Sequence, residues 1–167
     1  MRWLWLSALV IVLDQIAKYL ASHYLPFQEP VAVMPFFNLT LMHNTGAAFS
    51  MLHSAGGWQR WFFAALAIGV STGIIVWLHS LPSGKRWLAC ALALVVGGAL
   101  GNLWDRLTLG YVIDFIQVHY ENHYFPAFNI ADSAISVGAV MMLIDAVFFD
   151  RGAEDAGHVV DKSARRT

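Results

Sequence analysis

A few acidic residues of this chain lie in or beside long apolar stretches, where charged side chains are rare. A side chain that ionises at bilayer depth costs at least a few kcal/mol, so each such residue is by default a candidate for a functional site. The remaining acidic residues fall in polar connections or in the polar segment after position 149. The candidates are Asp14, Asp105, Asp114, Asp132 and Asp145.

Asp114 and Asp132 are the two candidates expected to share a site. Asp114 lies between Ile113 and Phe115 in an extended apolar segment, where an unpaired carboxylate is costly. Asp132 follows Asn129, which could cap a helix with that acid in its first turn, so a structural role also explains Asp132. If the two carboxyl groups approach each other, their repulsion leaves one proton on the pair, and one acid and one base can then activate water. The pattern predicts an aspartic-protease dyad.

The other three acids have simpler explanations. Asp14 stands four residues before Lys18 on the same helix face, so the two side chains either form an anchoring ion pair or hold a substrate. Asp105 is expected to pair with the neighbouring Arg106, which could instead meet a lipid phosphate or a peptide carbonyl. Asp145 is expected to pair with a basic group at the far end of its helix.

Two other kinds of chemistry are open alternatives. His119 and His123 stand four residues apart with Glu121 between them, which suggests a zinc protease, although that motif has Glu directly after the first His and needs a helix. Intramembrane acids are equally typical of a small proton-coupled transporter. A transporter usually has internal repeats or broken helices at mid-membrane, whereas no repeat is visible in this sequence and the acids are expected at one face of the membrane.

The composition indicates which elements must position these residues. Of 167 residues, 58% are hydrophobic and 13% are charged, whereas soluble domains carry roughly 25% charged residues. Four apolar stretches are long enough to cross a bilayer, at about 3–24, 61–78, 87–103 and 131–149. The net charge of −1 leaves no basic face for nucleic acid. The sequence predicts one α-helical integral membrane domain over 1–149, followed by a disordered tail over 150–167.

The basic residues predict the orientation of these spans, because Lys and Arg favour the cytoplasmic side. Most of them cluster at the N-terminus, in the short connection at 79–86, and in the tail: Arg2, Lys85, Arg86, Arg151, Lys162, Arg165 and Arg166. Both termini are therefore expected in the cytoplasm, and the connections at 25–57 and 104–130 outside.

The outer connections are expected to hold a small β-sheet. Residues 29–49 mix β-branched and aromatic residues with prolines, and residues 111–118 alternate in polarity. An open sheet cannot face lipid without unpaired backbone groups, so we expect it to rest at the membrane surface. Glycines at 97, 98 and 101, and at 69 and 73, are expected to allow close packing between helices.

Five motifs in order make the chain similar to bacterial lipoprotein signal peptidases, the signal peptidase II family. They cover about residues 3–149 and agree with the family at each motif position. They are Asp14-Gln15-x-x-Lys18, Asn44-Thr45-Gly46-Ala47-Ala48-Phe49, Gly97-Gly98-Ala99-Leu100-Gly101-Asn102-Leu103-x-Asp105-Arg106, Val112-Ile113-Asp114-Phe115 and Phe128-Asn129-x-Ala131-Asp132-Ser133.

The resemblance implies an aspartic endopeptidase of the bacterial inner membrane, with its active site at the extracytoplasmic face and no metal or organic cofactor. Its substrates would be prolipoproteins, cut just before a cysteine that carries a diacylglyceryl group, and its other partners membrane lipids; we expect a monomer. By motif match, Asp114 and Asp132 would be catalytic. The residues expected to bind substrate are Asn44, Asn102, Arg106 and Asn129, supported by Asp14 and Lys18 from the first helix.

Overall fold

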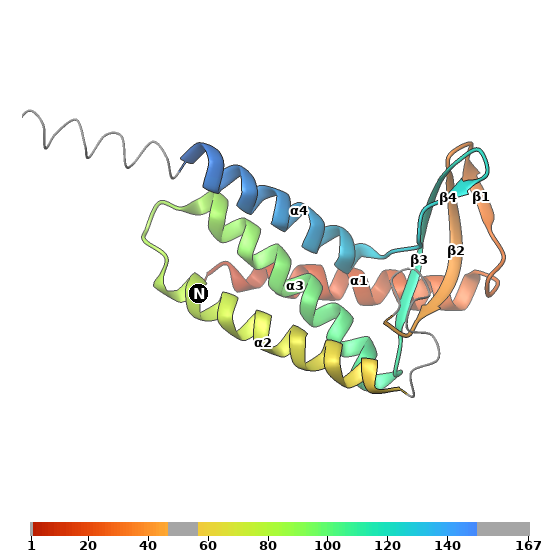
Figure 1. Cartoon of the computed structure of the whole chain (residues 1–167), viewed down its shortest axis with the longest axis horizontal. Coiled ribbons are helices and arrows are strands. Elements are labelled where there is room, and N and C mark those ends of the chain that lie inside the picture. Colours follow the sequence, from red (N-terminus) through yellow and green to blue (C-terminus); the bar gives the residue numbers. More distant parts are fainter. Residues whose placement is uncertain (1, 47–56, 150–167) are drawn as a thin grey trace, which may run out of the picture.

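The computed structural model describes residues 2–46 and 57–149, which form a helical bundle with a small sheet at one end (Figure 1). The helices are α1 (Leu4–Tyr24), α2 (Trp58–Ser80), α3 (Arg86–Thr108) and α4 (Ile130–Ile144), and the π-helical turn η2 (Asp145–Phe149) continues α4. The strands are β1 (Val31–Met34), β2 (Phe37–Asn44), β3 (Val112–Tyr120) and β4 (His123–Tyr124). The expected tail at 150–167 lies outside the described residues.

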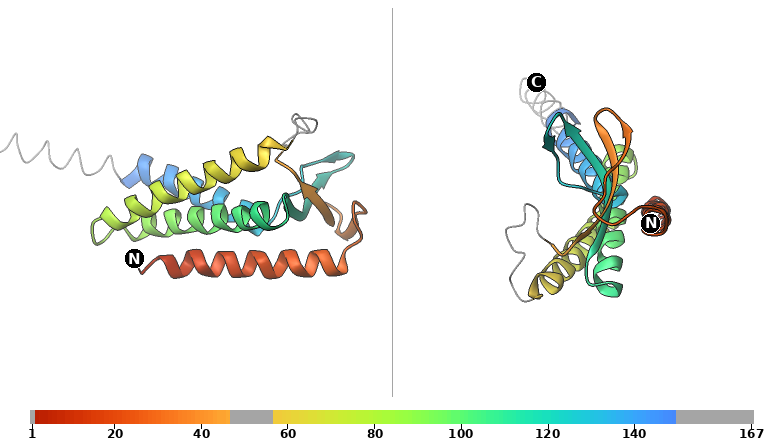
Figure 2. Two further views of the ribbon diagram at one scale, coloured as in Figure 1. Left: turned by 90° about the horizontal axis from the view of Figure 1, so that it is seen from below. Right: turned by 90° about the vertical axis from the view of Figure 1, so that its right-hand side faces the viewer.

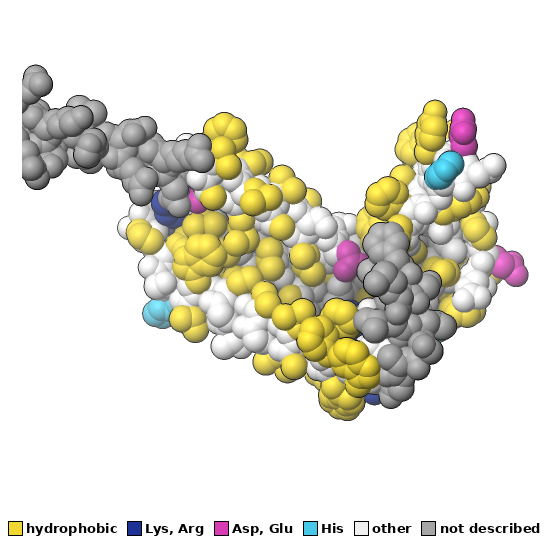
Figure 3. Space-filling view, viewed as in Figure 1, with side chains coloured by type: hydrophobic (Ala, Val, Ile, Leu, Met, Phe, Trp, Pro, Cys, Tyr) yellow, Lys and Arg dark blue, Asp and Glu magenta, His cyan; other side chains and the backbone are white. Residues whose placement is uncertain are grey.

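Four of the described helices are long and apolar enough to cross a membrane. They are Leu4–Tyr24, Trp58–Ser80, Arg86–Thr108 and Ile130–Phe148. A helix lies at each of the four stretches that the sequence predicts as spans, and the second and third helices are longer than expected. Hydrophobic side chains cover most of the bundle surface in the space-filling view, with few charged ones among them (Figure 3). A helix surface of this kind suits lipid as its surroundings.

Helix α3 is the centre of the bundle, and α1, α2 and α4 pack around it (Figures 1 and 2). Its middle turns are fully enclosed, with Ala91, Leu92 and Ala93 at 0% exposure. The glycines of this helix allow the close approach that the sequence predicts. A Cβ on Gly98 would collide with the backbone of Ala131 in α4, and one on Gly97 would meet α1.

The same expectation is wrong for Gly69 and Gly73 in α2. A Cβ added to either glycine would meet no atom within 4 Å, so these positions face outward and make no close helix contact within the described chain. The spacing of small residues indicates that a helix can pack closely, but it does not identify a neighbouring helix.

The four strands form one antiparallel sheet in the order β1-β2-β3-β4 at one end of the bundle, and the last turns of α1 run alongside it (Figure 2). This confirms the strands expected at 29–49 and 111–118. Strand β3 begins buried at Val112 and becomes exposed toward Tyr120, so the sheet is anchored at the end that meets the bundle. Ile113 and Phe115 form a small core there with Leu41 and Ala21.

Candidate active site

Asp114 lies at the anchored end of β3, where the sheet meets the helices. It is 2% exposed, although β3 belongs to the connection between α3 and α4. Both carboxylate oxygens accept amide hydrogens: Asn44 Nδ2 donates to Oδ2 at 3.0 Å and Asn129 Nδ2 donates to Oδ1 at 2.7 Å. The expectation that this carboxyl needs partners is confirmed, since two asparagines from β2 and from the start of α4 supply them.

Asp132 lies in the first turn of α4, as the sequence predicts. Asn129 caps the helix: its Oδ1 accepts from the Asp132 amide at 2.9 Å, and Asp132 Oδ2 accepts from the Asn129 amide at 3.3 Å. This reciprocal arrangement is a capping box. The other oxygen, Oδ1, accepts from Asn102 Nδ2 at 2.7 Å. Asp132 is thus both part of a helix cap and held toward α3 by a second asparagine.

Asn102 and Asn129 link the two aspartates through a chain of hydrogen bonds. Asn129 Nδ2 reaches Asn102 Oδ1 at 3.1 Å as well as Asp114, while Asn102 Nδ2 donates to Asp132. Asn129 is 0% exposed and Asn102 is 6% exposed, so both amides are structural parts of this network. Hydrogen bonds from these two side-chain amides fix the orientation of both carboxyl groups.

Electrostatics favours a proton on Asp114. Burial, followed by the nearby negative charge of Asp132, raises the pKa of Asp114 to about 7, and the hydrogen bonds from Asn44 and Asn129 only partly oppose that rise. Desolvation and a like charge both disfavour a carboxylate. Near neutral pH, Asp114 therefore exchanges a proton readily in the presence of a second carboxyl group. This is the property that general acid–base chemistry requires.

Lys18 is buried next to this site, and its ammonium group has three partners. Its Nζ lies 2.7 Å from Asp14 Oδ2 and 2.8 Å from Asp105 Oδ2, and it donates to Asn102 Oδ1 at 3.0 Å. Asp14, Lys18 and Asp105 are each at most 1% exposed. The predicted Asp14–Lys18 ion pair is confirmed. Its complete burial favours the anchoring role over direct contact with a substrate.

Each of the two carboxylate partners of Lys18 reaches one of the two candidate catalytic segments. Asp14 Oδ1 accepts from the amide of Ala131, the residue before Asp132, at 2.8 Å. Asp105 Oδ2 accepts from the amide of Ile113, the residue before Asp114, at 3.1 Å. One ammonium thus ties α1 to both backbone segments that present the aspartates.

Arg106 does not form the predicted ion pair with Asp105. Asp105 instead binds Lys18, and Gln15 Nε2 donates to its Oδ1 at 2.8 Å. Arg106 Nη1 donates to the Asn102 carbonyl at 3.2 Å, and the guanidinium lies over the Phe63 ring at 5.2 Å. Its side chain is near enough to both Asp132 and Asp114 to feel their charge. Arg106 therefore interacts with the charges of Asp132, Asp114 and Asp105 without forming an ion pair with Asp105.

Two members of this network were missed by reading the sequence alone. Asp105 was assigned to Arg106, and Gln15 was given no role. The sequence does contain a sign of this network: Asp14, Gln15 and Lys18 lie close together in one apolar span. Three polar side chains there need polar partners from another span.

The residues proposed for a zinc site lie apart from this centre. His119 pairs with Tyr124, and His123 with Tyr120, across the β3–β4 hairpin, so the helix that a zinc protease motif needs is not formed there. The His119 ring stacks on Tyr124 with centroids 5.0 Å apart. Within 2–46 and 57–149, no three His, Cys, Asp or Glu side chains are grouped so that they could hold a metal.

Comparisons with known proteins agree on one family. The family model described as signal peptidase (SPase) II matches residues 6–148. A lipoprotein signal peptidase of Acinetobacter baumannii is 58% identical over 149 residues, covering 89% of this chain and 85% of that protein. One of Pseudomonas aeruginosa is 54% identical over 158 residues, covering 93% of each. A solved structure described as a bacterial membrane enzyme superposes with a TM-score of 0.78 at 29% identity, covering 89% of this chain and 94% of that one.

Proposed function

Because this chain belongs to the signal peptidase II family, enzymes that cleave signal peptides from prolipoproteins, we propose that Asp114 and Asp132 are the pair that activates water. The chain is a membrane protease, and the transporter and zinc-protease alternatives are not favoured. The observation that carries the proposal is the environment of Asp114: a buried carboxyl group, hydrogen-bonded through both oxygens, whose pKa is raised to about 7 by burial and by Asp132.

The reaction follows from one proton shared by two carboxyl groups. The ionised carboxylate takes a proton from water, and the water oxygen attacks the peptide carbonyl carbon while the protonated carboxyl donates to the carbonyl oxygen. The tetrahedral intermediate collapses when the peptide nitrogen accepts the proton that the first carboxylate took from water and leaves as the amine of the new N-terminus. One hydroxyl of the intermediate returns its proton to the other carboxylate and becomes the carbonyl of the new carboxyl terminus. The two protons from water end on the two products, so the pair returns to its singly protonated state.

The site asparagines divide into two roles in this proposal. Asn102 and Asn129 are buried and orient the carboxyl groups, so they act as positioning residues. Asn44 and Arg106 are partly exposed and lie beside the pair, so they are the residues that contact the substrate peptide. Asp14 and Lys18 are buried, so in this proposal they hold the backbone segments of the pair in place and do not contact the substrate.

The location of the site suits a lipid-modified substrate. The pair lies where apolar helices end and the sheet begins, so acyl chains can stay in the bilayer while the scissile bond reaches water. We expect cleavage just before a diacylglyceryl cysteine. Both carboxyl groups and their network come from one chain, which supports a monomeric enzyme.

The rate of cleavage is expected to depend on pH through this shared proton. The pKa of Asp114 lies above its usual value, so the proton persists to about pH 7 and is lost above it. For a lipidated prolipoprotein peptide, kcat/KM should be bell-shaped, with an alkaline limb near this value. Asn44→Ala removes a donor to the carboxylate and should move that limb to higher pH. A profile that is flat between about pH 5 and 9 would contradict the shared proton.

We propose that the site faces the outside of the bacterial inner membrane. Lys85 and Arg86 lie at the opposite end of the bundle, and basic connections favour the cytoplasmic side. In a Cys90→Ser background, Glu29→Cys on the sheet side should react with an impermeant maleimide on intact spheroplasts. Ser83→Cys should react only after permeabilisation. The reverse labelling pattern would overturn this orientation.

A further inference from the structure

Phe63 lies in the second turn of α2, and its ring reaches the surroundings of both residues expected to contact the substrate peptide. A Cβ on Gly46, two residues after Asn44, would lie 2.8 and 2.9 Å from two carbons of this ring, so the Gly46 backbone packs directly against it. The guanidinium carbon of Arg106 lies over the same ring, 5.2 Å from its centroid. One partly buried ring therefore contacts both the turn after Asn44 and the side chain of Arg106.

The contact with Gly46 bears on the direction in which the Asn44 amide points. The Gly46 amide donates to Asn44 Oδ1 at 2.9 Å, so Nδ2 is the group that faces Asp114, to which it donates at 3.0 Å. Gly46 has a φ of +110°, a conformation that favours glycine, and the missing side chain leaves the space that the Phe63 ring fills. Without the ring this turn loses its support, and the donor to Asp114 is free to rotate away.

The contact with Arg106 limits the positions that the guanidinium can take. The face of an aromatic ring attracts a cation within about 6 Å of its centroid. Arg106 Nη1 also donates to the Asn102 carbonyl at 3.2 Å, one turn earlier in α3. The ring and the carbonyl together hold the guanidinium where it feels the charges of Asp132 and Asp114.

The start of α2 is itself attached to the end of α3, which fixes the Phe63 ring relative to Arg106. Arg60 Nη2 donates to the carbonyl of Leu107, the residue after Arg106, at 2.8 Å. Ala64 is 3% exposed, so the turn that carries Phe63 is packed into the bundle. The adjacent Phe62 points elsewhere, because neighbouring helix residues are about 100° apart, and it is 51% exposed.

We propose that Phe63 is a positioning residue for substrate binding, because one ring holds both the turn after Asn44 and the guanidinium of Arg106. This inference rests on the proposed function, in which Asn44 and Arg106 contact the peptide beside the two aspartates. Phe63 acts through these two residues and not on the reacting bond. Loss of the ring should therefore weaken substrate binding more than the chemical step.

Three substitutions at Phe63 separate the aromatic ring from the space that it fills. The assay is steady-state cleavage of a lipidated prolipoprotein peptide by the purified full chain in detergent. Phe63→Ala should raise KM about tenfold and lower kcat less than about threefold. Phe63→Leu fills most of the space without an aromatic face, so KM should rise about fivefold, the effect of one lost cation–π contact. Phe63→Tyr keeps the ring, so both constants should stay within about twofold of those of the unmodified enzyme.

The pH profile of kcat/KM gives a readout that a general loss of stability would not move. The charged groups around Asp114 come from three helices: Asp132, Lys18 and Arg106. In Phe63→Ala, a displaced Asn44 amide and a displaced guanidinium both stabilise the Asp114 carboxylate less, so its pKa rises further. The alkaline limb should therefore move to higher pH in Phe63→Ala and stay in place in Phe63→Tyr.

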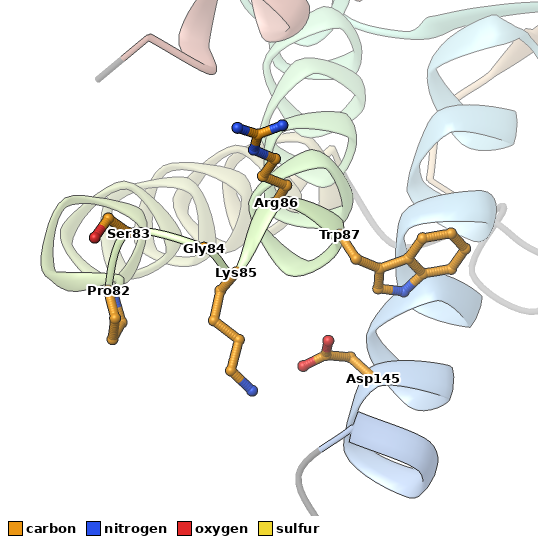
Figure 4. Close-up of a pocket in the computed structure, with 7 residues that line it drawn as sticks. All are labelled: Pro82, Ser83, Gly84, Lys85, Arg86, Trp87 and Asp145. Carbon is orange, nitrogen blue, oxygen red and sulfur yellow. The ribbon is translucent and has the colours of Figure 1, made fainter. Parts of the chain in front are cut away.

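Two controls distinguish positioning from a loss of stability. Phe62→Ala removes the same side chain from the adjacent position and should leave KM and the pH profile unchanged. Trp87→Phe acts at the opposite end of the bundle, where the Trp87 ring is directed toward α4 and its Nε1 donates to the Met141 carbonyl at 2.8 Å (Figure 4). This variant loses that hydrogen bond, so it should melt at a lower temperature while KM and the pH profile stay unchanged.

The proposal is overturned if Phe63→Ala has the KM and the pH profile of Phe62→Ala. It is also overturned if Phe63→Leu and Phe63→Tyr have the same KM, and this comparison decides the question if Phe63→Ala does not fold. Asp114→Asn in the same assay separates this outcome from a failure of the proposed function. Full activity of Asp114→Asn would overturn the dyad, whereas an inactive Asp114→Asn beside an unchanged Phe63→Ala would overturn the positioning role alone.

Discussion

Asp114→Asn and Asp132→Asn should each reduce cleavage of a lipidated prolipoprotein by about 10²- to 10⁴-fold, the contribution of a positioned acid or base. Asn keeps the size of the side chain but cannot exchange the proton that the mechanism needs. In Asp132→Asn, the amide oxygen can still accept from Asn102 and Asn129 Oδ1 can still cap the backbone amide of residue 132, but the new amide NH2 replaces the acceptor of the Asn129 amide. In Asp114→Asn, one amide group must face the donor of Asn44 or Asn129, at a cost of about 1–3 kcal/mol.

The measurement is kcat/KM for a synthetic lipidated substrate, with the purified full chain in detergent. Asp145→Asn is the matched control, because the same chemical change is made at the opposite end of the bundle and should leave cleavage at the level of the unmodified enzyme. Thermal unfolding of each variant separates loss of chemistry from loss of fold. If either dyad variant folds normally and keeps more than about a tenth of the activity, the two-aspartate mechanism is wrong.

Lys18→Met is the second change with a large expected effect, and it should lower both stability and activity. Met fills similar space but removes the ammonium between Asp14 and Asp105, which leaves two buried carboxylates without their cation. Removing one partner of a buried ion pair typically costs about 3–5 kcal/mol. The Asn102 amide, which holds Asp132, loses a donor at the same time.

A triple variant distinguishes the charge of this network from its geometry. Asp14→Asn, Lys18→Met and Asp105→Asn together remove all three charges, and a buried ionic cluster replaced as a set often regains stability. We expect the triple variant to melt within a few degrees of the unmodified enzyme. If Lys18 acts only by positioning, the kcat of the triple variant should recover together with its stability. If the charge of Lys18 also shifts the pKa values of Asp114 and Asp132, the limbs of the pH profile of kcat/KM should stay displaced in the triple variant. A Lys18→Met single variant with unchanged melting temperature would contradict the anchoring role.

Much of the architecture could be predicted because it depends on local patterns. Span positions follow from hydropathy and strands from alternation, and both are properties of consecutive residues. The third span was nevertheless ended at 103, whereas α3 continues to Thr108. Asp105 and Arg106 make that last turn polar, but Asp105 is buried among partners from α1. A hydropathy window averages consecutive residues only. It therefore cannot detect that the charge of Asp105 is compensated by a side chain on another helix.

The errors at the site have the same origin. Adjacent residues on a helix point in directions about 100° apart, so Asp105 and Arg106 were poorly placed to pair. The sequence indicated that Lys18 and Asp105 needed partners, but it did not indicate that they were partners of each other. The dyad itself could be proposed because Asp114 stands in an apolar strand, where a carboxyl group has no local compensation.

The contact between Asp14 and the amide of Ala131 joins the first span to the fourth. Asp14 and Lys18 must enter the bilayer long before α4 exists, and only as each other's partner. Asp132 is the last of the catalytic and network residues to be synthesised. A nascent chain therefore has no complete proposed water-activating pair until its fourth span is inserted, so we expect no proteolytic activity before that step.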